Sequence, residues 1–178
     1  GLSQGMLLPV LAIFLEKMGV SSTLNGLNAA ALYVGSFAMT LMAERLVGKF
    51  GFKKLMLLGL FIVMIALPLF PLVPGIAFWF VLRLLVGIGD SAIHYVAQLW
   101  VLMVTSPENR GRNLSIYGIS YGIGFSIGPL GISLLDFGMA TPFLLMTAMF
   151  TIVALLVWWK LPAGGPGRGE EIKPEKGR

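Results

Sequence analysis

The sequence contains no cysteine, one histidine and few charged residues. Without cysteine the chain can form neither a disulfide nor a thiolate metal site, and one histidine cannot build a histidine-rich metal centre. Charged residues make up 12% of the chain, about half of their usual share in a soluble domain. Because 57% of the residues are apolar, a water-soluble fold could not bury the apolar surface. The composition therefore predicts an integral membrane protein with no metal and no cofactor.

Six apolar segments, separated by short polar or proline-rich stretches, follow one another along the chain. Apolar stretches of about 20 residues can cross a bilayer as helices, so the sequence predicts an all-α membrane protein built as a six-transmembrane-helix bundle. The spacing of Leu27 and Gly35 recurs at Leu114 and Gly122, which indicates two three-helix repeats, as in many secondary transporters. The same repeat places the beginning of the first, short helix before the start of this sequence. The predicted helices cover residues 1–15, 24–47, 55–73, 76–104, 113–135 and 141–159.

The basic residues predict how the chain sits in the membrane. Basic side chains favour cytoplasmic loops. Here they gather between the second and third segments, between the fourth and fifth, and after the sixth, while the other loops hold only Lys17. Both termini are therefore expected in the cytoplasm, with the protein in the plasma membrane (the inner membrane of a bacterium). This placement also argues against a nucleic acid partner, despite a net charge of +5. Residues 1–161 form the predicted transmembrane domain, and residues 162–178 a flexible cytoplasmic linker or tail.

The fourth segment contains three ionisable residues, Arg83, Asp90 and His94, in a run that is otherwise apolar enough to span a membrane. On a helix these positions share one stripe, with His94 one turn from Asp90 and Arg83 two turns away on the other side. A charge at the centre of a bilayer costs about 2.5 kcal/mol or more, so such residues are expected to face protein or water. We predict that the three residues couple proton movement to transport or contact the substrate. The alternative is a structural ion pair that sets the register of the helix.

Polar side chains in the other segments predict which helices enclose that pathway. The first, second, fourth and fifth segments contain amides, tyrosines and ionisable groups, whereas the third and sixth are almost purely apolar. We expect the first group to surround a cavity, and the third and sixth segments to face lipid. Each polar residue has the alternative role of a hydrogen bond between helices. The candidates for the cavity lining are Gln4, Asn25, Asn28, Tyr33, Gln98, Tyr117, Ser120 and Tyr121.

Two glycine motifs stand in the fourth and fifth segments. Arg83 is followed by Gly87 and Gly89 in the pattern R-x-x-x-G-x-G-x-x-A, and residues 124–131 fit G-x-x-x-G-P-x-G. Glycines four residues apart allow a neighbouring helix to approach closely, and a proline removes one helical hydrogen bond and permits a bend. Ordinary packing of membrane helices is the alternative to a role in conformational switching. The residues assigned to packing and switching are Gly87, Gly89, Gly124, Gly128, Pro129 and Gly131.

These two motifs, in this order and on these segments, resemble the major facilitator superfamily of secondary transporters. The glycine–proline motif is similar to that of the proton-coupled drug antiporters in this family. The resemblance covers the whole chain as the N-terminal six-helix half, and it implies a second half, in the same polypeptide or in a homodimer. It also implies that Arg83 takes part in proton coupling.

Between the second and third segments the chain departs from the family's loop motif, because Gly48 stands in the place of an aspartate. The resemblance implies that this cytoplasmic loop latches the two halves together. The candidate residues of the loop motif are Glu44, Lys49, Gly51 and Lys53.

Two short patterns typical of enzymes also occur. Residues 87–90 match the G-x-G-D of intramembrane aspartyl proteases, which need two aspartates that share a proton, but Asp136 lies in a predicted loop. Residues 118–122 match the G-x-S-x-G of serine hydrolases, which works at a sharp turn, whereas Ser120 lies in the middle of a predicted helix. The sequence therefore predicts that the protein is not an enzyme, and an intramembrane protease is the remote alternative.

The predicted function is proton-coupled secondary transport by alternating access, in which this chain supplies one half of the transporter. The expected partners are the lipid bilayer, a small-molecule substrate, protons and the second six-helix half. Efflux of drug-like or lipophilic compounds is the favoured hypothesis. A sugar or metabolite permease of the same fold and a non-transporting membrane sensor or scaffold are the alternatives.

Overall fold

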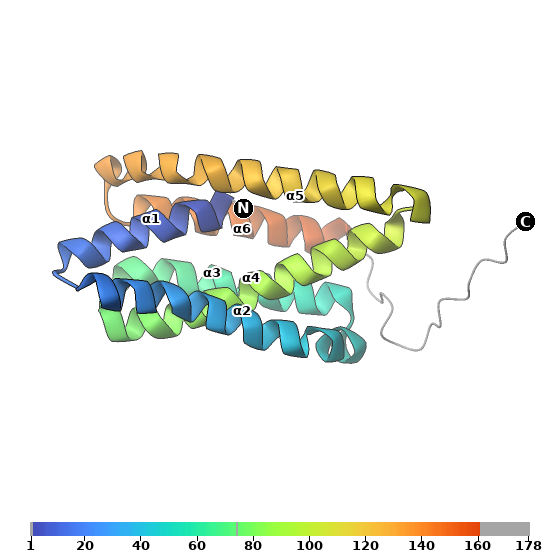
Figure 1. Cartoon of the computed structure of the whole chain (residues 1–178), viewed down its shortest axis with the longest axis horizontal. Helices are drawn as coiled ribbons and strands as arrows, with labels where there is room; N and C mark the ends of the chain where they lie inside the picture. The colour runs from blue at the N-terminus through green and yellow to red at the C-terminus, as the bar shows by residue number, and fades with distance from the viewer. Residues whose placement is uncertain (1, 74, 161–178) are drawn as a thin grey trace, which may run out of the picture.

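The computed structural model describes residues 2–73 and 75–160, so the predicted tail at residues 162–178 lies outside the described part. Long helices lie side by side and run back and forth along the long axis of the molecule (Figure 1). This arrangement confirms the predicted all-α fold class. The elements are α1 (Leu2–Lys17), α2 (Ser22–Phe50), α3 (Phe52–Leu72), α4 (Ile76–Val104), η1 (Pro107–Asn109), α5 (Arg110–Ile127), η2 (Gly128–Phe137) and α6 (Thr141–Lys160).

Five helical stretches in the described part are long and apolar enough to cross a membrane. They are α2, α3, α4, α6 and the continuous run of η1, α5 and η2 over Pro107–Phe137. α1 has 16 residues, fewer than the roughly 20 that a span requires. It packs within the bundle against α5 and η2, so it belongs to the same helical unit as the five spans.

α4 lies at the centre of the bundle and packs against α2 on one side and α3 on the other. The glycines of its motif make both approaches possible. A Cβ atom added at Gly87 would overlap the backbone carbonyl of Leu32 in α2, and one added at Gly89 would lie 2.7 Å from the carbonyl oxygen of Gly59 in α3. A side chain at either position would therefore push α4 away from a neighbour.

The fifth predicted helix changes character near its middle. It begins at Arg110, slightly earlier than predicted, and its α-helical part ends at Ile127, where η2 continues as a 3₁₀ helix. Pro129 accounts for the change, because proline has no N–H and its ring clashes with the carbonyl one turn earlier in an α-helix. At this junction Gly128 lies against α1, where an added Cβ atom would overlap the backbone of Gly5. The glycine–proline motif is thus the contact between η2 and α1.

The predicted cytoplasmic loop between the second and third helices, residues 48–54, is shorter in the structure. α2 continues through Glu44 and Lys49, and α3 begins directly after Gly51 with Lys53 in its first turn. Gly51 has a φ of 83°, a conformation that glycine adopts without a steric penalty. Glutamate and lysine are good helix formers, so the charged motif lengthens both helices and leaves a one-residue connection.

An aromatic cluster closes the opposite end of the bundle. Phe70 stacks on Phe143 with 5.6 Å between ring centroids, and Trp79 packs edge-on against Phe70 and Phe14. The indole N–H of Trp79 also donates a hydrogen bond to the carbonyl of Phe70 at 3.1 Å. All four side chains are buried. The cluster joins α1, α3, α4 and α6, and the polar residues lie nearer the middle of the bundle.

Candidate functional site

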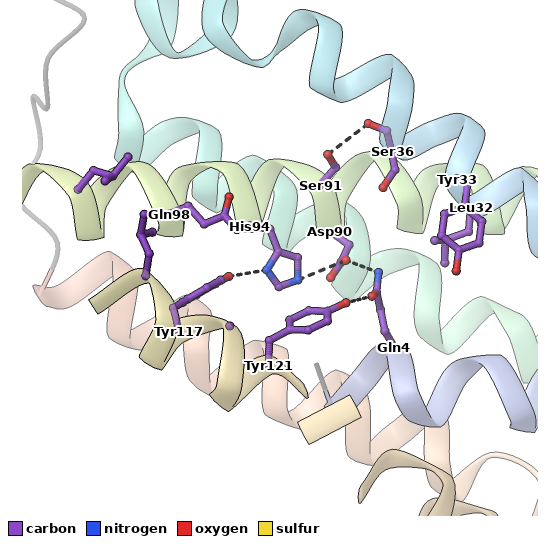
Figure 2. A pocket seen from close by; sticks show the side chains of 13 residues that line it. Gln4, Leu32, Tyr33, Ser36, Asp90, Ser91, His94, Gln98, Tyr117 and Tyr121 are labelled. Atoms are coloured by element: carbon purple, nitrogen blue, oxygen red, sulfur yellow. Dashed lines mark hydrogen bonds and ion pairs between the residues drawn. The ribbon is translucent and has the colours of Figure 1, made fainter. Parts of the chain in front are cut away.

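Polar and aromatic side chains surround a cavity of about 580 Å³ in the described bundle. Figure 2 shows these side chains converging from α1, α2, α4 and α5. These are the four helices that the sequence predicts for the cavity. The lining consists of Gln4, Leu32, Tyr33, Ser36, Asp90, Ser91, His94, Gln98, Leu102, Leu114, Tyr117, Gly118 and Tyr121.

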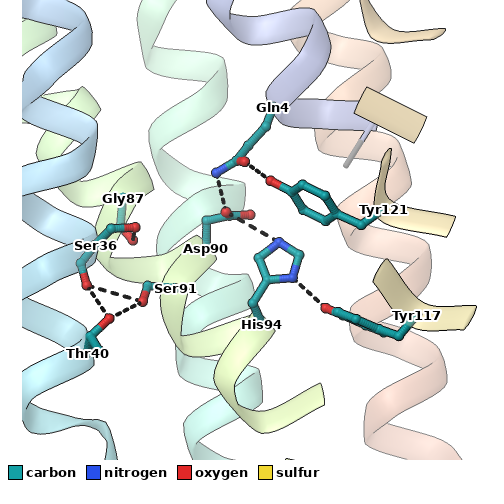
Figure 3. Close-up of polar contacts among 9 residues, drawn as sticks. All are labelled: Gln4, Ser36, Thr40, Gly87, Asp90, Ser91, His94, Tyr117 and Tyr121. Carbon is teal, nitrogen blue, oxygen red and sulfur yellow. Dashed lines mark hydrogen bonds and ion pairs between the residues drawn. The ribbon is translucent and has the colours of Figure 1, made fainter. Parts of the chain in front are cut away.

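A hydrogen-bonded network joins three helices along one wall of the cavity (Figure 3). The side-chain amide of Gln4 donates to a carboxylate oxygen of Asp90, and Nε2 of His94 lies 3.5 Å from the same oxygen. On its other side, Nδ1 of His94 meets the hydroxyl of Tyr117. The hydroxyl of Tyr121 donates to the amide oxygen of Gln4. The network therefore runs from α5 through α4 to α1 and back to α5.

Helical spacing brings these residues into place. Asp90 and His94 stand four residues apart on α4, as do Tyr117 and Tyr121 on α5, so each pair occupies one face of its helix. The ring of His94 lies edge-on to that of Tyr121, with 4.8 Å between centroids. The Asp90 side chain is 9% exposed and that of His94 24%, so the carboxylate lies deeper than the imidazole. Only Gln4 comes from a part of the chain distant from both pairs.

The donor and acceptor pattern is self-consistent when Asp90 is a carboxylate. Gln4 and the Nε2–H of His94 then donate to it, and Nδ1 of His94 accepts from Tyr117, a tautomer assigned from the bonding pattern. If Asp90 takes up a proton, it gains an O–H donor and loses acceptor capacity. If the proton binds the oxygen that Gln4 and His94 share, one of them must turn or give up its bond. A proton on that oxygen would rearrange the contacts among α1, α4 and α5.

Three hydroxyl side chains join α2 to α4 on the other side of the cavity (Figure 3). Ser91 donates to the carbonyl of Ser36 at 3.2 Å and lies 3.3 Å from the hydroxyl of Thr40. Ser36 in turn donates to the carbonyl of Gly87 at 3.4 Å. Sequence reasoning missed this cluster. The available signal was that Ser91 directly follows Asp90 in an apolar segment.

Arg83 lies outside the cavity, although it shares a helix with Asp90. Its side chain is fully buried, and its guanidinium has no hydrogen-bond partner within residues 2–73 and 75–160. The same holds for the side-chain amide of Asn28 in α2. The close approach of Leu32 to Gly87 sets the register of the parallel helices α2 and α4. One turn earlier, this register places Asn28 level with Arg83.

The other predicted lining residues divide between the cavity and its surroundings. Tyr33 and Gln98 line the cavity. Asn25 does not, and its amide donates to the carbonyl of Ala12 at 3.1 Å, which joins α1 to the beginning of α2. Ser120 also lies outside, on an exposed face of α5, and donates to the carbonyl one turn earlier in its own helix.

No group of three acidic or histidine side chains in the described part is arranged to hold a metal ion. Asp90 and His94 supply two such side chains, and the other members of their network are the amide of Gln4 and the phenols of Tyr117 and Tyr121. What the site offers is a carboxylate held by two neighbouring side chains, inside a pocket with aromatic and aliphatic walls.

Comparison with known proteins places this chain in a family. The family model described as "Major Facilitator Superfamily" matches residues 1–178. The chain is 42% identical over 159 residues to the uncharacterized MFS-type transporter YfkF of Bacillus subtilis, an alignment that covers 89% of this chain and 41% of that protein.

Two further relatives from Bacillus subtilis carry names that state a function. Multidrug resistance protein 2 is 28% identical over 152 residues, covering 85% of this chain and 38% of the relative. Multidrug resistance protein 1 is 27% identical over 180 residues, covering 97% of this chain and 45% of the relative. The chain thus spans less than half of the length of these relatives.

Proposed function

The chain belongs to the major facilitator superfamily of membrane transporters, and from this membership we propose that it is the N-terminal six-helix half of a proton-coupled exporter. The family makes it an integral, multi-pass membrane protein and a transporter, not an enzyme. The proposed cargo is a small, drug-like or lipophilic compound, which crosses the membrane by alternating access. The whole transporter combines this half with a second six-helix half, in the same polypeptide or in a second copy.

The observation that carries this proposal is the network centred on Asp90. A carboxylate within a membrane-spanning segment costs free energy, and such residues usually serve a function. This one touches α1 through Gln4 and α5 through His94 and Tyr117. A proton that binds there changes bonds between three helices at once. The same event can therefore load a proton and loosen one packing arrangement of the bundle, which is what coupling requires.

The aromatic and aliphatic part of the lining is the observation that supports a lipophilic cargo. Three tyrosine rings and three leucine side chains contribute to the walls, and one carboxylate supplies the formal negative charge. Such walls bind planar or apolar compounds through apolar contacts, and the tyrosine hydroxyls can add hydrogen bonds. The names of the two multidrug resistance relatives are in line with this cargo.

The second half is proposed from faces that the bundle leaves uncovered. Phe37 and Leu41 of α2 and Ile119 and Ile123 of α5 are each more than half exposed. In Figure 1, α5 lies along one edge of the bundle and α2 lies toward the opposite edge, with α1 and the C-terminal part of α4 between them. A second six-helix half resting on both helices would cover these apolar side chains and close the cavity from the remaining side.

The proposed orientation follows from one end of the bundle, which we call the basic end. α2, α4 and α6 finish there and α3 and α5 begin there, at the right of Figure 1. By the positive-inside rule this end faces the cytoplasm. The basic residues at this end are Arg45, Lys49, Lys53, Lys54, Arg110, Arg112 and Lys160.

Replacing Asp90 tests the proposed function. In proteoliposomes that hold this half together with its second half, a pH gradient should drive solute movement. Asp90→Asn removes the exchangeable proton but keeps the shape of the side chain and one acceptor oxygen, so the gradient should no longer drive transport. The measurement is solute flux with and without the gradient.

Asp136→Asn is the matched control, because this exposed carboxylate at the end of η2 lies outside the cavity. Its flux should equal that of the unchanged protein. If Asp90→Asn transports with the same response to pH as the unchanged protein, Asp90 is not the coupling residue.

A further inference from the structure

Two shallow grooves flank α6 near the basic end of the bundle. One lies between α3 and α6, has a volume of about 440 Å³, and is lined by Lys54, Leu57, Leu58, Phe61, Met64 and Ala154. The other lies between α4 and α6, has a volume of about 360 Å³, and includes Trp100 and Lys160. Each groove has aliphatic or aromatic walls and a single lysine. The same construction thus occurs on both sides of one helix.

The α3–α6 groove has the length of an acyl chain in one leaflet. Lys54 and Met64 are ten residues apart on α3, which corresponds to roughly 15 Å along a helix with a rise of 1.5 Å per residue. The hydrocarbon core of a bilayer is about 30 Å thick, so the groove extends over about one leaflet. It begins at the membrane surface, because Lys54 lies in the first turn of α3.

The only charge in this groove is positive and lies where a lipid headgroup would be. Lys54 is exposed and makes no ion pair with a carboxylate of the described residues. Phe61 and Leu58 are exposed as well, so the apolar walls face the lipid phase. A cation at the headgroup level above apolar walls complements a lipid with a phosphate and no compensating positive charge. Zwitterionic lipids offset that attraction with their own cation.

We propose that an anionic phospholipid binds in the α3–α6 groove, with its phosphate on Lys54 and an acyl chain along residues 57–64. The lipid bridges α3 and α6, the two helices that stand outside the transport cavity. Its binding site is separate from the Asp90 network and goes beyond the proposed transport function. Lipid binding at this site requires neither the second half of the transporter nor a known substrate.

The absence of cysteine from the chain allows a direct test. A single Ile65→Cys substitution labelled with bimane places a fluorophore beside the groove, one turn beyond Phe61 on α3, in the full chain reconstituted in phosphatidylcholine nanodiscs. Brominated phosphatidylglycerol and brominated phosphatidylcholine are then added at equal mole fractions, and quenching measures which lipid occupies the site. We expect phosphatidylglycerol to bind about fivefold more tightly, the factor that one lysine contributes near an anionic headgroup.

Lys54→Gln and Lys53→Gln form the decisive pair. Both remove one charge from the same turn of α3, but only Lys54 lines the groove. Lys54→Gln should abolish the preference for phosphatidylglycerol, and Lys53→Gln should keep most of it. Equal losses in the two variants would show diffuse attraction to the basic end, and no preference in the unchanged chain would show ordinary boundary lipid. Either result overturns the proposal.

A second measurement covers the case in which the labelled variant does not fold. Native mass spectrometry of the unlabelled chain, released from mixed phosphatidylglycerol and phosphatidylcholine, counts the lipids that remain bound. The unchanged chain and Lys53→Gln should retain phosphatidylglycerol, and Lys54→Gln should lose it. Identical lipid retention in all three would also overturn the proposal.

Discussion

Asp90 and Arg83 lie two turns apart on α4, but one has hydrogen-bonding partners and the other has none among the described residues. Asp90 has Gln4 and His94 as partners in the wall of the cavity. Arg83 is 0% exposed and has no hydrogen-bond partner among the described residues. A buried charge without a partner costs several kcal/mol, so stability does not account for this arginine. We infer that Arg83 acquires a partner in another conformation of the transporter.

Replacing Arg83 by a side chain of similar length tests this inference. Arg83→Met should raise the stability of the bundle, by about 1 kcal/mol or more, because it removes a buried charge and keeps the packing. Proton-coupled transport should fall sharply in the same variant. Thermal unfolding in detergent and flux in proteoliposomes measure the two effects.

Arg112→Met is the control for the loss of a positive charge, because Arg112 is exposed in the first turn of α5. Its unfolding temperature should stay close to that of the unchanged chain. A less stable Arg83→Met would instead indicate that the guanidinium stabilises this conformation, and the structural alternative would then be correct.

Among the helical elements, α4 and η2 depend most on glycine. α4 contacts α2 through Gly87 and α3 through Gly89, and η2 contacts α1 through Gly128. η2 is also a 3₁₀ helix of 10 residues, longer than the three or four residues usual for this conformation, and such stretches often mark hinges. The junction between α5 and η2 is therefore the proposed hinge for conformational switching.

Gly128→Ala tests how closely α1 and η2 are held together. The new methyl group would overlap the backbone of Gly5, and backbone cannot move aside as a side chain can. We expect a loss of about 1–3 kcal/mol of stability, the usual cost of overpacking. Gly122→Ala is the matched control on α5, because nothing lies within 4 Å of its added Cβ atom.

The control should be neutral or slightly stabilising, because alanine favours a helix more than glycine does by up to about 1 kcal/mol. Thermal unfolding of both variants in the same detergent gives the comparison. If Gly128→Ala and Gly122→Ala unfold at the same temperature, α1 and η2 are not in close contact.

At the scale of the whole molecule, the proposed function makes this chain half of a transport pathway. Its cavity has walls from α1, α2, α4 and α5, and the apolar faces of α2 and α5 remain uncovered. Phe37 of α2 is 66% exposed and Ile123 of α5 is 56% exposed. Ile65 of α3, at 48%, is exposed on a helix that we expect to face lipid.

Accessibility to lipid-dissolved oxygen distinguishes a face covered by protein from a face covered by lipid. Single substitutions Phe37→Cys and Ile123→Cys, each carrying a nitroxide spin label, should collide often with oxygen when this chain is reconstituted alone. These collisions should become rarer when the second half is present. The label at Ile65→Cys should keep the same collision rate in both preparations, because lipid covers it in each. Unchanged collision rates at all three positions would contradict the proposed interface.

Much of the fold could be predicted from local sequence. Apolar runs of spanning length must be helices in a bilayer, because only a helix or a closed barrel satisfies the backbone there. The contact of Asp90 with His94 could also be predicted, since four-residue spacing on a helix brings side chains together. The short connection at Gly51 could not be predicted, because the charged residues around it are equally acceptable in a helix and in a loop.

The sequence alone determined the membrane class, the helical fold, the family and the pair formed by Asp90 and His94. The class, the fold and the pair follow from composition and from spacing within one segment, and the family follows from the resemblance carried by the motifs of the fourth and fifth segments. Only the tertiary structure decided that Gln4 and Tyr117 complete the network and that Arg83 stays apart from it. Arg83 and Asp90 share a face of α4, but of the two only Asp90 lines the cavity enclosed by α1, α2, α4 and α5. Which residues meet across helices depends on their register and rotation, and these are set by close glycine contacts between segments distant in the sequence.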